Sequence, residues 1–158
     1  MAVYTKINKK DLLSINRFAG KKFINFKGIK QGIENTNYLL RSNNEKFILT
    51  IFEKRVSKKE IPFFMKLMDQ LNNSKINCPK PLKNNKGNYL FKLKNKTACI
   101  VSFLNGKDKK ILSLKNCYDV GKMIALMHSS TKKIQLYRKN SMGVKNLNPL
   151  LNSIKFKS

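Results

Sequence analysis

The sequence is poor in acidic residues, histidine and cysteine. It holds 8 Asp and Glu against 34 Lys and Arg, a single His, and three Cys at positions 78, 99 and 117. One His and three cysteines without a CxxC pair argue against a zinc site. The odd number of cysteines and their apolar neighbours favour reduced, mostly buried thiols, as in cytoplasmic proteins.

Long apolar stretches are also missing. No run approaches the roughly 18 apolar residues that a membrane-spanning helix needs, and residues 1–6 contain no apolar segment of the kind found in signal peptides. Both absences predict a cytoplasmic protein with no membrane partner.

The shortage of acids leaves a formal net charge of +26 and a pI near 10.2. Such an excess is typical of proteins that bind nucleic acid or an anionic membrane surface. Lysine is scattered through every segment, however, and accompanies abundant Asn and Ile, as codon usage in an A/T-rich genome would produce. A codon effect and a functional basic surface therefore both remain open, and the charge says little about function.

Hydrophobic spacing and turn residues predict an α+β fold. A first helix follows a capping box formed by Asn8 and Asp11 and ends at Gly20. A second helix is expected after a capping box at Ser57 and Glu60. Strands are predicted at 22–27, 37–41, 46–52, 88–93 and 97–103, so that this second helix separates the third strand from the fourth.

A third helix is predicted from about Leu114, with an apolar side that carries Cys117 and His128, the latter as a packed structural histidine. No clear periodicity follows Thr131. The order of elements matches the small lobe of a protein-kinase-like fold, a five-stranded antiparallel sheet with one packed helix. Residues 1–104 are expected to form this nucleotide-binding lobe, and residues 105–158 the hinge and a truncated start of the helical large lobe.

The segment 28–40, GIKQGIENTNYLL, sets a glycine-bearing turn between two strands. Gly28 and Gly32 can adopt positive φ and let backbone N–H groups approach a phosphate without obstruction. Asn35 is expected to turn its amide toward a phosphate or to cap the turn. An ordinary β-turn would explain the glycines in isolation, but their position in the order of elements favours phosphate binding.

Phosphoryl-transfer enzymes of this kind place a Lys on the third strand and an acidic partner on the following helix. Here Thr50 stands at the lysine position and Phe64 near that of the acid. The charges of residues 53–55 are interpreted as a solvated strand end. Ser102, Phe103 and Leu104 are candidates to present backbone groups to an adenine edge, with a plain edge strand as the alternative.

Several segments, in register, resemble bacterial homoserine kinases of the aminoglycoside-phosphotransferase-like type: GIENTNYLL (32–40), FILTIFEKR (47–55), IPFF (61–64), CPKP (78–81) and FLNG (103–106). The resemblance implies ATP- and Mg²⁺-dependent phosphorylation of the L-homoserine hydroxyl, in threonine biosynthesis. It implies ATP-binding roles for Gly32, Glu34, Asn35 and Asn37 at the turn and for residues 102–104 at the hinge. Thr50 in place of Lys is also expected of this family.

Members of that family are much longer, and their catalytic loop and metal-binding Asp are expected beyond residue 158. No catalytic or metal-ligating residue is therefore predicted within this chain. Two other functions remain as alternatives: a related kinase-like phosphotransferase with a different small acceptor, and a basic nucleic-acid-binding protein. The last would lose affinity steeply with rising salt.

Overall fold

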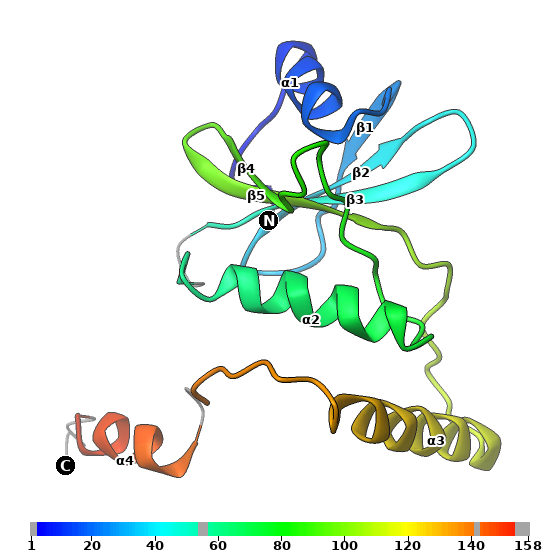
Figure 1. The fold of residues 1–158 in the computed structure, drawn as a ribbon, viewed down its shortest axis with the longest axis vertical. Coiled ribbons are helices and arrows are strands. Elements are labelled where there is room, and N and C mark those ends of the chain that lie inside the picture. The colour runs from blue at the N-terminus through cyan, green and yellow to red at the C-terminus, as the bar shows by residue number, and fades with distance from the viewer. Residues whose placement is uncertain (1–2, 54–56, 141–142, 154–158) are drawn as a thin grey trace.

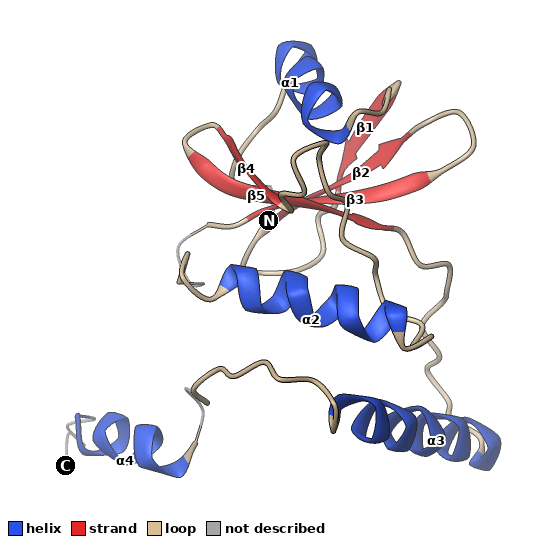
Figure 2. Cartoon of the chain, in the orientation of Figure 1, coloured by secondary structure: helices blue, strands red, loops and turns tan. Residues whose placement is uncertain are grey.

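The computed structural model describes residues 3–53, 57–140 and 143–153. A five-stranded sheet lies between helix α1 (Lys9–Ala19) on one face and helix α2 (Ile61–Asn73) on the other (Figure 1). Helices α3 (Leu114–Thr131) and α4 (Val144–Ser153) lie beyond α2, on the side away from the sheet (Figure 2). The predicted α+β architecture is confirmed.

The sheet is antiparallel throughout. It consists of β1 (Asn25–Gly28), β2 (Thr36–Arg41), β3 (Lys46–Ile51), β4 (Leu90–Leu93) and β5 (Lys96–Ser102), in the order β1-β2-β3-β5-β4. The chain leaves the sheet after β3, forms α2, and returns through β4 so that β5 pairs with β3. This arrangement brings the end of β5 close to the β1–β2 hairpin, although the two are far apart in the sequence.

Alternating side chains divide the sheet into two faces. On the α1 face, Tyr38, Leu40, Leu49 and Ile100 are buried and pack with Ile15 of α1. The intervening residues point to the opposite face, where α2 covers only part of the sheet.

Helix α2 covers the side of the sheet formed by β4 and β5. Its buried residues Ile61 and Met65 pack with Cys99 of β5, and Leu90 of β4 packs against this cluster.

The first predicted capping box is confirmed and the second is wrong. Asn8 and Asp11 exchange both capping hydrogen bonds at the start of α1. Before α2, Ser57 and Glu60 instead bracket a turn, in which Glu60 N donates to Ser57 O at 2.9 Å. The helix begins at Ile61, and the Glu60 side chain forms no capping bond to the described backbone, because its carboxylate pairs with Arg138.

Helix α3 begins at a capping box of Ser113 and Asn116, close to the expected residue. None of its residues, all of which the structure describes, is buried. His128 is exposed, so the prediction of a packed histidine is wrong, and Cys117 is an exposed exception to the expectation that the thiols are mostly buried. Of the other two cysteines, Cys99 is buried and Cys78 is partly buried.

Helix α4 was not predicted. It contains Pro149 and three Asn residues, which have low helix propensity and obscure any periodicity. In the part of the chain that the structure describes, no helix has the length and apolar character that crossing a bilayer requires.

Candidate nucleotide-binding site

A cavity of about 580 Å³ lies between the β1–β2 hairpin and the segment that follows β5. Its walls come from β1, the turn after it, β2 and the first residue past β5: Lys27, Gly28, Ile29, Lys30, Gln31, Leu39 and Phe103. The glycine-bearing turn and the predicted hinge therefore share one hollow.

Two predicted site residues, Gly28 and Phe103, line this cavity, and five lining residues were missed. Leu39 had a detectable signal, because it alternates along the strand with the core residues Tyr38 and Leu40. Lys27 pairs with Leu39 across the strands, a register that the structure shows. The three residues 29–31 lie inside the turn itself, where no periodicity applies.

The two glycines of the turn serve different purposes. Gly32 has φ +99, and a Cβ built there would meet nothing within 4 Å among the described residues, so glycine is required by conformation. Gly28 is a strand residue paired with Tyr38 and does not have positive φ, contrary to the prediction. A Cβ at Gly28 would lie 3.0 Å from the Val3 side chain, so a larger residue would crowd that side chain.

Three further predicted residues form contacts beside the cavity and are not among its lining residues. Asn35 Oδ1 accepts a hydrogen bond from Glu53 N at 3.3 Å, which ties the end of the turn to the backbone after β3. Asn37 and Thr50 lie opposite each other on β2 and β3, and Thr50 Oγ1 donates to Asn37 Oδ1 at 2.8 Å. Glu34 lies in the turn and is exposed.

The hinge residues are tied to neighbouring segments. Ser102 N donates to Lys80 O at 2.9 Å, and Phe103 N donates to Lys46 O at 3.1 Å. These two N–H groups are satisfied within the protein. Leu104 is partly exposed at 40% and begins the linker toward α3.

Glu53 is not the solvated strand end that the sequence suggested; Lys54 and Arg55 lie outside the described residues. Its side chain is only 10% exposed and forms an ion pair with Lys96. Its Oε1 accepts hydrogen bonds from Thr36 Oγ1 at 2.6 Å and Thr5 Oγ1 at 2.7 Å. Burial opposes ionisation, but the bonds from Lys96, Thr36 and Thr5 outweigh it and hold the pKa of Glu53 below its ordinary value.

An ion pair joins the start of α2 to the segment after α3. Arg138 Nη2 lies 2.9 Å from Glu60 Oε2, and the Arg138 guanidinium lies over the Phe64 ring, 5.1 Å from its centroid. Phe64 stands where an acid was expected, and the acidic residue Glu60 lies one helical turn earlier. Its partner is Arg138, which lies outside the sheet.

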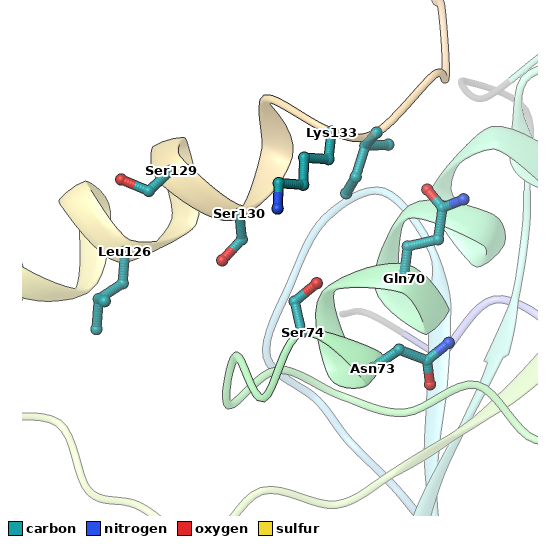
Figure 3. A pocket seen from close by; sticks show the side chains of 8 residues that line it. Gln70, Asn73, Ser74, Leu126, Ser129, Ser130 and Lys133 are labelled. Carbon is teal, nitrogen blue, oxygen red and sulfur yellow. The ribbon is translucent and has the colours of Figure 1, made fainter.

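A second hollow of about 550 Å³ lies between the C-terminal ends of α2 and α3. Figure 3 shows Ser74, Ser130 and Lys133 around it. The C-terminal ends of helices carry partial negative charge, which disfavours a phosphate there. None of its lining residues (Gln70, Asn73, Ser74, Leu126, Ser129, Ser130, Lys133 and Ile134) is acidic, so they offer no carboxylate to a metal ion.

Divalent metal ions such as Mg²⁺ prefer carboxylate and other oxygen ligands. Among the described residues, no three His, Cys, Asp or Glu side chains gather into a group able to hold a metal ion.

Comparison with curated proteins identifies homoserine kinases among the relatives of this chain. The chain is 38% identical over 151 residues to the homoserine kinase of Rhodopseudomonas palustris strain TIE-1, and 37% identical over 145 residues to that of Bartonella tribocorum. These matches cover 95% and 91% of this chain but 46% of each relative. The chain thus spans about half the length of the curated relatives it matches.

Solved structures share the fold at low sequence identity. Spectinomycin phosphotransferase, solved with ADP and spectinomycin, matches 98% of this chain and 49% of its own with a TM-score of 0.65 at 13% identity. An amicoumacin kinase, solved with AMP-PNP and Ca²⁺, matches 95% and 49% with a TM-score of 0.72 at 16% identity. The sequence profile of the phosphotransferase enzyme family matches residues 25–151, and the chain belongs to that family.

Proposed function

We propose that this chain is the ATP-binding part of a homoserine kinase, which transfers the γ-phosphate of ATP to the hydroxyl of L-homoserine. The observation that carries the proposal is the cavity in which the turn after β1 meets Phe103 at the end of β5. In this proposal residues 1–104 form the nucleotide-binding lobe, and residues 105–158 form the hinge and the start of the helical lobe.

The cavity walls suit the parts of a nucleotide. Leu39 and Phe103 offer apolar surface to the adenine ring, and the turn around Gly32 offers backbone N–H groups to the phosphates. Thr50 cannot supply the positive charge that a third-strand lysine would, and its hydroxyl is engaged with Asn37. Lys27 and Lys30, which both line the cavity, are the cations placed to neutralise phosphate charge.

The proposal also specifies L-homoserine as the phosphate acceptor. The homoserine kinases above share 37 to 38% identity with this chain, whereas the two antibiotic kinases share 13 to 16%. Sequence identity therefore favours L-homoserine over an antibiotic. Phosphate transfer by the complete protein to L-homoserine, compared with spectinomycin as acceptor, tests this choice.

ATP binding tests the site itself. Gly32→Ala introduces a side chain where φ is +99, so we expect a distorted turn and about tenfold weaker ATP binding by isothermal titration calorimetry, a change of about 1.4 kcal/mol. Gly87→Ala is the matched control: Gly87 also has positive φ, at +77, but lies in the turn at residues 84–88 ahead of β4, not in the turn after β1. Absence of ATP binding to the unaltered chain, or equal affinity in both variants, would refute this nucleotide site.

A further inference from the structure

The segment ahead of α1 is fixed to β2 by buried side chains. Tyr4 N and Thr5 N both donate to Thr36 Oγ1, at 2.9 and 3.1 Å. Ile7 N donates to Tyr38 Oη at 3.2 Å, and that hydroxyl donates to Thr5 O at 2.9 Å. Because Thr36 and Tyr38 are buried, these bonds are shielded from water and hold the segment in one position.

From this fixed segment, the Tyr4 side chain extends to the glycine turn. Tyr4 Oη donates to Ile33 O at 3.0 Å, and Ile33 directly follows Gly32. Both side chains are exposed, Tyr4 at 56% and Ile33 at 75%, so this contact adds little to the hydrophobic core. It joins the N-terminal segment to the backbone of the turn, next to the residue whose φ is positive.

The end of the same turn is held by a second contact from the same network. Asn35 Oδ1 accepts from Glu53 N, and the Glu53 carboxylate accepts from the hydroxyls of Thr5 and Thr36. Lys96 of β5 completes the network through its ion pair with Glu53. The N-terminal segment, the turn, the end of β3 and the start of β5 are therefore connected through hydrogen bonds on both sides of the turn.

We propose that Tyr4 is a positioning residue of the nucleotide site, which orders the turn for phosphate binding through its bond to Ile33 O. The inference rests on the proposed ATP-binding function. A turn that binds phosphate through its backbone must have its N–H groups aligned, and a turn that is already ordered loses less conformational entropy on binding. Tyr4 itself does not line the cavity, so it acts through the turn.

The test compares Tyr4→Phe with Tyr118→Phe, which removes the same hydroxyl from a tyrosine that is 70% exposed on α3. Calorimetric titrations with ATP and ADP, competition with adenosine, and the melting temperature are measured for both variants and the unaltered chain. We expect Tyr4→Phe to bind ATP and ADP about three- to tenfold more weakly, the range of a single hydrogen bond. The affinity for adenosine and the melting temperature should stay unchanged, as should all properties of Tyr118→Phe.

Two results would overturn the role of Tyr4. One is unchanged ATP affinity in Tyr4→Phe; the other is an equal loss for ATP and adenosine together with a lower melting temperature, which indicates a general structural effect. If the unaltered chain binds no ATP, the proposed function itself fails, and this outcome is distinct from the other two.

Discussion

Replacing Thr36 by Val should destabilise the fold far more than its small chemical change suggests. The substitution keeps the branched shape of a fully buried side chain and removes only its hydroxyl. That hydroxyl accepts from Tyr4 N and Thr5 N and donates to Glu53 Oε1. Val therefore leaves two backbone N–H groups without their acceptor and deprives the Glu53 carboxylate of one donor.

The cost follows from these three bonds. Each N–H left without a partner costs about 1 to 3 kcal/mol when buried, and a lost bond to a charged group costs about 1.5 kcal/mol or more. Because Tyr4 N is only partly buried, its share lies at the low end, and the expected total is roughly 4 kcal/mol. Thr36→Ser keeps the hydroxyl and removes one buried methyl group, which costs about 1 kcal/mol.

Urea unfolding measures both variants. The chain has no Trp, so far-ultraviolet circular dichroism is the suitable signal. We expect the free energy of unfolding of Thr36→Val to lie about 3 kcal/mol below that of Thr36→Ser. A difference under about 0.5 kcal/mol would refute the reasoning, since it would mean that the hydroxyl does not hold the N-terminal segment.

Two further predictions concern titratable groups. Because the folded-state pKa of Glu53 lies below its ordinary value of 4.5, its ionised form stabilises the fold above that pH, and the contribution is lost as the pH falls through the folded pKa. Glu53→Gln should therefore lower the free energy of unfolding more at pH 7 than at pH 3; equal losses would contradict this. Burial raises the pKa of Cys99 to about 12, so a thiol reagent at pH 8 should label exposed Cys117 first, Cys78 more slowly and Cys99 only on unfolding. Rapid labelling of all three thiols in the folded protein would count against this burial pattern.

Local sequence patterns were sufficient to predict an element where the interaction that defines it joins residues close in the sequence. The capping box of Asn8 and Asp11 joins residues three apart, and both of its hydrogen bonds form. The same signature failed at Ser57 and Glu60, because the Glu60 carboxylate pairs with Arg138, a residue 78 positions away. A motif of four residues contains no information about such a partner.

The site shows the same division. Gly32 was identified from sequence because positive φ at a turn is a property of one residue and its neighbours. Glu53 was misread because its surroundings come from Thr5, Thr36 and Lys96, which are distant in the chain. In the sequence, the residues next to Glu53 form only a charged run at the end of a predicted strand, and nothing there indicates these distant partners.

The sequence by itself determined the order of the elements as far as α3, the kinase-like lobe and the position of the glycine turn. These depend on hydrophobic periodicity and on contiguous motifs, and both are local. Only the tertiary structure decided that Lys27, Leu39 and Phe103 share one cavity, and that Tyr4 contacts Ile33. Those contacts arise from strand pairing and from the packing of the N-terminal segment on β2, which join residues with no common local pattern.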